Sequence, residues 1–329
     1  MAGSERRMMR RGVIGGIGAA ALAGLGWVGW TRLRRNPVLG DAAFAARLAA
    51  PLPRPDGPLA VYHLGHSLVG RDMPAMLAQL ADAGLGPGHR YDSQLGWGTS
   101  LREHYKGQGS VNGFAVENAH PRFRPAEAAV DSGDYDALVM TEMVELRDAI
   151  RWHASAEYLA RWAARARAAR PDVRLYLYTT WHNLDDPAGF LDRIDRDQAE
   201  LWEGAVLRPA LARLPDAAIR VIPGGTALAA FVRAAEAQAG MPDRAALFRR
   251  EADGRQDTIH PSALGLYLIA LAHYAVLYHR DPAGLPHALR LADGTPAEAP
   301  TPEAARLMQA VVWDVVRAMP QTGVAPARA

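Results

Sequence analysis

The sequence predicts an α/β fold in which a mainly parallel sheet of five strands lies between two layers of helices. Short apolar runs alternate along the chain with longer segments whose apolar residues recur at helical spacing. Strands separated by helices form βαβ units, which give a parallel sheet covered on both faces. The chain has 329 residues, 49% of them hydrophobic, and this is enough to bury a full core. Cysteine is absent, so disulfides, thiolate catalysis and cysteine-based zinc sites are excluded.

The expected elements follow one another in a regular order. The strands are expected at residues 59–64, 89–96, 135–140, 173–180 and 219–225. The helices are expected at residues 73–83, 154–169, 191–214, 226–239, 262–278 and 301–319. Thr301 and Pro302 form a typical helix start, with an N-cap followed by proline. Segment 262–278 is strongly apolar, but it is short for a membrane span and contains His273, so we expect a core helix.

The N-terminal part of the chain differs from the rest in composition. Residues 1–35 hold seven arginines and one acid, and they flank residues 12–30, a run of 19 residues without charge. At 1.5 Å per residue this run can just span a bilayer core of roughly 30 Å. We therefore expect residues 1–35 to be an export signal or an anchor in the cytoplasmic membrane, with the body in the periplasm or outside. Residues 36–58 are expected to be a linker with a short helical patch, and residues 59–329 the globular domain.

The charge distribution argues against nucleic acid as a partner. The formal net charge is +2, and the arginines and the acid of residues 1–35 give +6, which leaves −4 for the remainder. A nucleic-acid-binding fold is expected to carry its basic residues on one face. A mildly acidic body with a basic tip does not fit that pattern. The sequence gives no indication of the oligomeric state.

Candidate catalytic residues lie where strands are expected to end. In an open parallel sheet, ligands bind beyond the carboxyl ends of the strands. Ser67 follows the first strand, and Asp257 and His260 lie in a polar stretch just before the apolar helix 262–278. Serine hydrolysis needs a hydroxyl, an imidazole that takes its proton and a carboxylate that orients the imidazole. Asp and His three residues apart can point the same way from one turn, so these residues form a candidate triad.

Other interpretations of these residues remain open. A Gly-x-Ser after a strand is often only a turn, and Asp257 can cap the following helix. The G-x-S-x-G nucleophile motif is missed, because Val69 stands where its second glycine belongs. No G-x-G-x-x-G follows the first strand, which argues against a dinucleotide cofactor, and no cofactor is expected. His63 and His66 have no carboxylate cluster near them in the sequence, so no metal site is expected either.

Two blocks of the chain resemble the SGNH hydrolases, the GDSL-type esterase superfamily. Gly65-His66-Ser67-Leu68 is similar to their Gly-Asp-Ser-Leu block, with His66 in the Asp position. Residues 257–261, DTIHP, match their D-x-x-H block. The resemblance covers about residues 59–280 and implies a flavodoxin-like three-layer α/β/α fold. It further implies Ser67 as nucleophile, His260 as general base and Asp257 as its orienting partner.

The middle blocks of the family are matched less well. The resemblance implies a glycine whose backbone N–H helps to bind the oxyanion, and Gly98 is the best match, with Gly96 as competitor. The third block normally supplies an asparagine side chain as another donor. Residues 141–145 read TEMVE and contain no asparagine, so Thr141, or Asn183 or His182 from the next strand's loop, is expected to replace it. Loss of one such donor costs about 10²–10³ in turnover.

Aromatic and polar residues on the same loops are expected to line the substrate site. These are Trp97, Glu142, Trp181 and His182. Aromatic rings there suit a sugar face or an acyl group, although tryptophan also commonly packs loops. Glu142 and Glu145 have a structural alternative as acidic residues at a helix N-terminus.

The resemblance implies a serine esterase that removes a small acyl group, such as acetate, from a glycan or another envelope molecule. An O-acyltransferase acting on the same substrates is the first alternative. The second is a non-catalytic, membrane-tethered glycan-binding or assembly protein with a decayed hydrolase fold. The missing asparagine favours this binding protein, whereas Ser67, Asp257 and His260 favour an enzyme.

Overall fold

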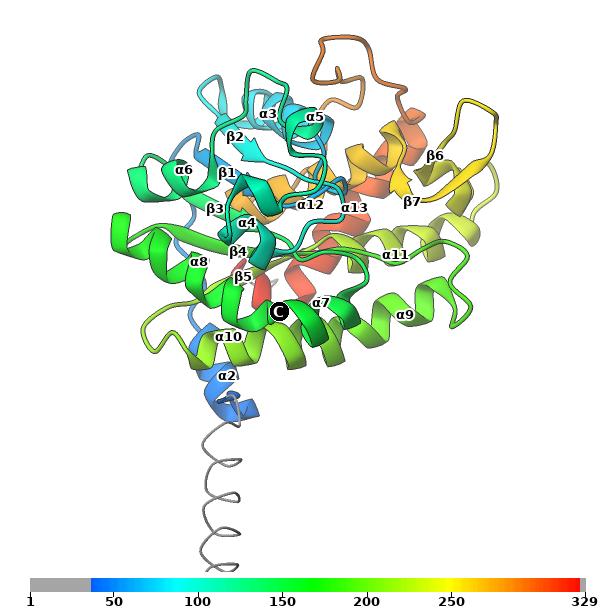
Figure 1. Ribbon diagram of the computed structural model, residues 1–329. Helices are drawn as coiled ribbons and strands as arrows, with labels where there is room; N and C mark the ends of the chain where they lie inside the picture. The colour runs from blue at the N-terminus through cyan, green and yellow to red at the C-terminus, as the bar shows by residue number, and fades with distance from the viewer. Residues whose placement is uncertain (1–36, 326–329) are drawn as a thin grey trace, which may run out of the picture. The chain divides into compact units, whose positions relative to one another are not determined.

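A five-stranded parallel sheet forms the centre of the protein, as predicted (Figure 1). The computed structural model describes residues 37–325, and residues 38–325 form one compact unit. The strand order is β2-β1-β3-β4-β5. The strands are β1 (Ala60–Leu64), β2 (Arg90–Gln94), β3 (Ala137–Met140), β4 (Arg174–Thr179) and β5 (Ile219–Pro223). The sequence thus predicted all five strands to within a few residues.

The carboxyl ends of neighbouring strands lie side by side. Leu64 of β1 pairs with Gln94 of β2 and with Met140 of β3, and Met140 pairs with Leu177 of β4. The loops that follow these strands therefore leave the sheet at a common edge. This alignment brings residues from distant parts of the chain into one site.

Helices cover both faces of the sheet. One face packs against α3 (Asp72–Leu85), α11 (Gly224–Glu236), α12 (Ala263–Tyr278) and α13 (Pro302–Ala318). The other packs against α2 (Asp41–Leu48), α4 (Leu101–Tyr105), α6 (Ala126–Ser132), α8 (Ser155–Ala169) and α10 (Arg208–Ala212). Side chains of β1, β3 and β4 alternate between the two cores, as Val61 and Tyr62 of β1 do. The three-layer architecture is the predicted α/β/α fold.

The strongly apolar segment 262–278 forms a core helix, α12, as expected. Every residue of α12 from Tyr267 to Tyr278 is buried, and the helix packs against α3, α11 and α13. Among the residues that the structure describes, no helix is long and apolar enough to span a bilayer. The expected anchor at residues 12–30 lies outside the described residues.

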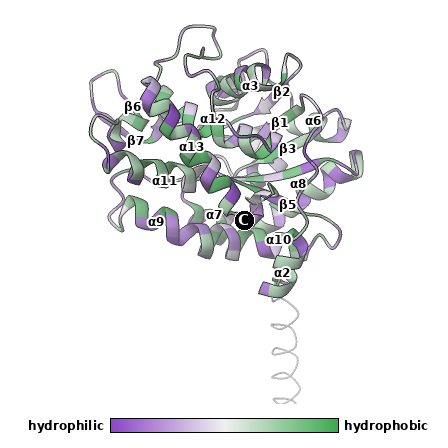
Figure 2. Ribbon diagram, turned by 180° about the vertical axis from the view of Figure 1, so that it is seen from behind, coloured by the Kyte–Doolittle hydropathy of each residue, from purple (hydrophilic) through white to green (hydrophobic). Residues whose placement is uncertain are grey.

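Three parts of the fold differ from the expected elements. The helix expected at 191–214 consists of α9 (Phe190–Asp197), a π-helical segment (Gln198–Leu207) and α10. Figure 2 shows α9 with both hydrophilic and hydrophobic residues, as befits a helix that lies at the surface. A further helix, α7 (Leu146–His153), precedes α8, and Ala154 separates them with a φ of 53°. An antiparallel hairpin of β6 (Phe248–Arg250) and β7 (Gln256–Pro261) precedes α12.

Short helical segments complete the connections. They are α5 (Phe114–Glu117) and the 3-10 turns at Gln108–Ser110, Arg244–Leu247 and Pro320–Thr322.

The segment expected to be a linker is packed onto the domain. Phe44 and Leu48 of α2 are buried in the core on the α8 face of the sheet. The Arg47 guanidinium donates hydrogen bonds to the carbonyls of Leu214 (2.5 Å) and Ala217 (3.1 Å). The helical patch expected there is present, and the packed unit begins well before residue 59.

Candidate active site

Ser67 lies in a tight turn between the end of β1 and the start of α3. Gly65 comes first, and a Cβ atom added to it would lie 2.6 Å from the Thr141 side chain, so only glycine fits. The carbonyl of His66 then accepts hydrogen bonds from the N–H groups of Val69 (2.9 Å) and Gly70 (3.2 Å). This turn presents the half-buried Ser67 at the carboxyl edge of the sheet.

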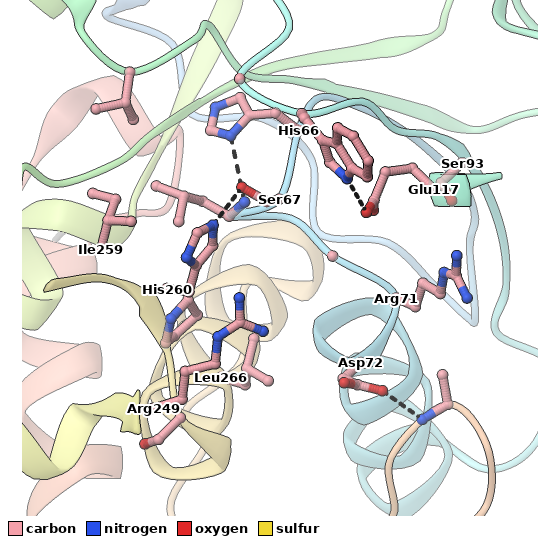
Figure 3. Close-up of a pocket in the computed structure, with 18 of the residues that line it drawn as sticks. His66, Ser67, Arg71, Asp72, Ser93, Glu117, Arg249, Ile259, His260 and Leu266 are labelled. Atoms are coloured by element: carbon pink, nitrogen blue, oxygen red, sulfur yellow. Dashed lines mark hydrogen bonds between the residues drawn. The ribbon is translucent and has the colours of Figure 1, made fainter. Parts of the chain in front are cut away.

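The hairpin β6–β7 brings His260 to Ser67. His260 Nε2 lies 3.1 Å from Ser67 Oγ, although the two residues are 193 positions apart in the chain. His260 Nδ1 lies 2.8 Å from Asp257 Oδ2 on the other side of the ring. Figure 3 shows the imidazole pointing at the serine. The structure thus joins the three residues proposed from the sequence in one hydrogen-bonded chain.

Asp257 is fixed from several directions. Its Oδ1 accepts from the backbone N–H groups of Ile259 (2.8 Å) and His260 (2.9 Å), and Arg249 Nε donates to Oδ2 (3.3 Å). Burial alone would raise the pKa of this carboxyl. The hydrogen bonds from the backbone and the ring of His260 and from Ile259 outweigh burial and hold the pKa of Asp257 well below its usual range. The carboxylate therefore stays charged beside the imidazole.

His66, which occupies the aspartate position of the GDSL block, connects two loops. Its Nε2 donates to the backbone carbonyl of Glu142 at 2.8 Å, and its Nδ1 accepts from Leu68 N–H at 3.4 Å. Burial lowers the pKa of His66 to about 4, so the ring is neutral at pH 7. The side chain ties the Ser67 turn to the loop after β3.

Two backbone N–H groups are free at the candidate oxyanion site. Gly98 lines the cavity beside Ser67 and has a φ of 52°. Within the described part of the chain, neither the Ser67 N–H nor the Gly98 N–H donates a hydrogen bond. Both remain available to an oxyanion.

The candidate side-chain donors divide into two groups. Thr141 is fully buried with its methyl group against Gly65, and it does not line the cavity, which argues against it as an oxyanion donor. Asn183 does line the cavity, and its Oδ1 lies 3.4 Å from the hydroxyl of Thr258. Asn183 and His182, the other two expected replacements for the missing asparagine, both line the cavity and stay candidates.

Glu142 and Trp181, which were expected to line the site, are structural residues. Glu142 is fully buried, and its Oε1 accepts from the N–H groups of Met143 (2.8 Å) and Leu101 (3.3 Å). Burial raises its pKa to about 7. Trp181 is 1% exposed, and its Nε1 donates to the Ile259 carbonyl at 2.9 Å, next to His260. Both side chains are buried under loops of the site and support them, and neither lines the cavity.

Trp97 and His182 lie where they were expected, in the wall of the cavity. Trp97 is 51% exposed, and its Nε1 donates to Glu117 Oε1 at 2.6 Å. His182 Nε2 lies 3.1 Å from Asp197 Oδ2. Burial and the nearby Arg193 guanidinium lower the pKa of His182.

An arginine that was not predicted as a site residue joins two loops of the cavity wall to α9. Arg193 of α9 is only 4% exposed. Its guanidinium contacts carboxylates of Glu145 (2.8 Å), Asp186 (2.6 Å) and Asp197 (2.8 Å). Glu145 also caps α7 by accepting from Arg147 N–H at 2.9 Å. The i,i+4 pair of Arg193 and Asp197 was the one signal in the sequence that pointed to this cluster.

The cavity at the carboxyl edge is large. Its volume is about 1420 Å³, and Ser67, His260 and Gly98 lie in its wall. Pockets of roughly 300–1,000 Å³ already enclose most of a drug-sized ligand. The site therefore has room for more than a small acyl group.

Comparisons with known proteins support the fold. No family model matches the chain, and no curated protein matches it. Among solved structures, a DUF4886 family protein from Bacteroides uniformis is similar at 16% identity and a TM-score of 0.53, over 79% of this chain and 95% of that one. A candidate GDSL-like lipase from Parabacteroides merdae has 14% identity and a TM-score of 0.42, over 69% and 99%. A carbohydrate esterase family 3 protein from Talaromyces cellulolyticus has 14% identity and a TM-score of 0.39, over 67% and 97%. The similarity to the first of these shows a shared α/β fold.

Proposed function

We propose that the protein is a serine esterase of the SGNH hydrolase type. The observation that carries the proposal is the chain of contacts Ser67 Oγ to His260 Nε2 (3.1 Å) and His260 Nδ1 to Asp257 Oδ2 (2.8 Å) at the wall of a large cavity. These distances lie within the hydrogen-bond reach that a nucleophile and its base require. Ser67 comes first in the chain, and Asp257 and His260 come later. This order agrees with that of the two blocks that resemble the SGNH hydrolases.

The proposed reaction has two stages. Ser67 Oγ attacks the ester carbonyl carbon while His260 Nε2 takes the hydroxyl proton, and the Ser67 and Gly98 N–H groups hold the oxyanion. The tetrahedral intermediate collapses, the bond to the alcohol breaks, and His260 returns the proton to the leaving alcohol. Water, deprotonated by His260, then attacks the acyl-serine; the bond between the acyl carbon and Ser67 Oγ breaks, His260 returns the proton to Ser67 Oγ, and the acid is released. Throughout, the Asp257 carboxylate stabilises the imidazolium that forms.

The substrate that we propose is a small acyl ester, such as an acetate, on a glycan or another envelope molecule. Trp97 supports this because a half-exposed aromatic ring in a cavity wall suits the apolar face of a sugar. Ester hydrolysis also requires no redox group, and the triad supplies both nucleophile and base.

Hydrolysis of p-nitrophenyl acetate by the purified full chain tests the proposal. We expect turnover by the wild type and a loss of at least about 10³ in kcat for Ser67→Ala. Ser110→Ala, a serine that does not line the cavity, is the matched control and is expected to keep wild-type turnover. Equal turnover by wild type and Ser67→Ala would show that Ser67 is not the nucleophile.

A further inference from the structure

The cavity continues from Ser67 towards β2, and two arginines stand in that part of its wall. Arg71 follows the Ser67 turn at the start of α3, and Arg122 precedes α6. Figure 3 shows Arg71 with Ser93 and Glu117 on one side of Ser67, and His260 with Arg249 on the other. We call the wall formed by Arg71, Arg122, Trp97 and His120 the β2 wall.

Neither arginine of the β2 wall has a carboxylate partner within the described residues, in contrast to arginines such as Arg165, Arg193 and Arg208. Arg71 donates to the backbone carbonyl of Val116. Arg122 lies over the ring of Tyr91, with its Cζ 5.1 Å from the ring centroid. Backbone and aromatic contacts hold both guanidinium groups in place, and their charge is left without an ion pair.

The carboxylates nearby are engaged elsewhere. Glu117 accepts from Trp97 Nε1 at 2.6 Å. Asp72 accepts from the backbone N–H of Ala292 at 2.8 Å, and Asp293 accepts from the backbone N–H and hydroxyl of Thr295. Neither Arg71 nor Arg122 forms an ion pair with an acid of this region in the described structure, so both guanidinium groups can pair with an anionic ligand in the cavity.

Trp97 is built as a rigid platform in the same wall. A Cβ atom added to Gly113 would lie 2.3 Å from the indole, so one face of the ring packs directly on the glycine backbone. Gly113 has a φ of 65°, which also favours glycine. The Glu117 carboxylate fixes the indole N–H, while 51% of the residue stays exposed. A ring held in this way offers a flat surface at little entropic cost.

His120 adds a polar group without a partner. Its Nε2 is buried and has no hydrogen-bond partner within the described residues. Burial and the Arg71 guanidinium lower the pKa of His120, which keeps the ring neutral and able to donate or accept one hydrogen bond.

We infer that the alcohol half of the substrate is an anionic sugar: its ring stacks on Trp97, and its carboxylate or phosphate binds Arg71 and Arg122. The inference rests on the proposed esterase function and names the substrate class of the same site. Guanidinium groups bind carboxylate and phosphate oxygens through paired N–H donors. A neutral sugar would leave both guanidinium charges without a partner.

A set of acetylated methyl glycosides tests the inference, with acetate release as the readout. The acid is an O-acetylated methyl glucuronoside, and its neutral match is the same compound with the carboxylate converted to the primary amide. An O-acetylated methyl glucoside 6-phosphate forms the third arm. We expect the wild type to prefer an anionic sugar over the amide by about tenfold or more in kcat/KM. The better of the two anions identifies the group that the arginines bind.

Variants separate charge from stacking. In Arg71→Gln and Arg122→Gln we expect the ratio of anionic to neutral kcat/KM to fall by about tenfold each, whereas Arg233→Gln on α11 keeps the wild-type ratio. Trp97→Ala is expected to lower kcat/KM for acid and amide alike, and Trp152→Ala, also exposed but away from the cavity, is the control. Thermal unfolding of each variant checks that it is folded.

The outcomes separate the two proposals. If the wild type hydrolyses none of the esters, including p-nitrophenyl acetate, the proposed function is wrong. If it hydrolyses acid, phosphate and amide equally well, the esterase stands and the inference about the anionic sugar is overturned. Preference for the anions that persists unchanged in both arginine variants would also overturn it.

Discussion

At the scale of single residues, Asp257 is the most firmly fixed member of the candidate triad. It accepts hydrogen bonds from two backbone N–H groups, from the His260 ring and from Arg249. These contacts fix the position of the carboxylate, and the carboxylate fixes the orientation and tautomer of His260. The serine, by contrast, is placed by the backbone turn alone.

Asp257→Asn is expected to lower kcat on the order of 10⁴ while leaving the fold intact. The amide is similar in size, but it cannot balance the charge of the imidazolium, and it favours the wrong tautomer of His260. Hydrolysis of p-nitrophenyl acetate by purified variants measures the effect. Asp253→Asn, in the turn of the same hairpin, is the matched control. Comparable losses of kcat in both variants would mean that kcat depends on the hairpin as a whole and not on the Asp257 carboxylate.

Glu142→Gln is expected to change the pH dependence of stability. The raised pKa of about 7 means that the folded chain keeps a proton that the unfolded chain releases at about pH 4.3. Between these values the free energy of unfolding of the wild type falls as pH rises, and the glutamine variant lacks this loss. Urea unfolding at about pH 4.5 and 7.5 should therefore show the variant gaining stability relative to wild type at the higher pH. A difference in stability between variant and wild type that is the same at both pH values would contradict this.

The sequence predicted the candidate triad better than its surroundings. Ser67, Asp257 and His260 lie in two short blocks with fixed spacing, and such blocks can be recognised in a single sequence. Thr141 and Trp181 lie on the expected loops, but their side chains turn into the core. The direction in which a loop side chain points depends on packing with distant segments, which local sequence does not encode.

At the scale of secondary-structure elements, His260 is placed by the contact between the start of α12 and the 3-10 turn Arg244–Leu247 that leads into the hairpin β6–β7. Ser262 N–H donates to the Leu247 carbonyl at 2.9 Å, and Ser262 Oγ donates to the Ala246 carbonyl at 2.6 Å. The sequence did not predict this hairpin because β6 has only three residues and shows no clear alternation. It also missed the π-helical segment Gln198–Leu207, whose apolar spacing resembles that of an ordinary helix.

Gly265→Ala is expected to destabilise this contact by about 1–3 kcal/mol, because the added methyl group overpacks it. A Cβ atom at Gly265 would lie 2.3 Å from the Leu247 carbonyl oxygen and 2.9 Å from Pro261 Cβ, so α12 and the hairpin must move apart. Urea unfolding measures the loss, and kcat is expected to fall with it because His260 shifts. Gly109→Ala, where nothing lies within 4 Å, is the control. Wild-type stability and kcat in Gly265→Ala would show that close packing at this glycine neither stabilises the domain nor positions His260.

At the scale of the whole molecule, the aligned strand ends unite residues from the loops after β1 and β4 and from the hairpin in one cavity. The alternation of strands and helices predicted this architecture, since each apolar run is long enough to form a buried strand. The strand order depends on long-range pairing and was not predicted. The packing of α2 onto the domain also depends on distant partners, among them Arg220, which donates to the Leu48 carbonyl at 2.9 Å.

Residues 12–30 are proposed to anchor the protein in the cytoplasmic membrane with the domain on the outer side. This rests on their 19 uncharged residues between arginines. We expect the full chain to stay with the membrane fraction after carbonate washing and a chain without residues 1–36 to be released from it. Protease added to spheroplasts should digest the domain of the full chain. Release of the full chain by carbonate, or a domain protected from protease, would contradict the anchor or its orientation.

The identity of the residue that forms the acyl-enzyme is the central claim, and covalent labelling tests it most directly. Purified protein treated with a fluorophosphonate is digested, and the modified peptide is identified by mass spectrometry. We expect a single adduct on Ser67 in the wild type and none in Ser67→Ala, because His260 contacts this hydroxyl alone among the described hydroxyls that line the cavity. An adduct on another residue, or equal labelling of wild type and Ser67→Ala, would contradict it.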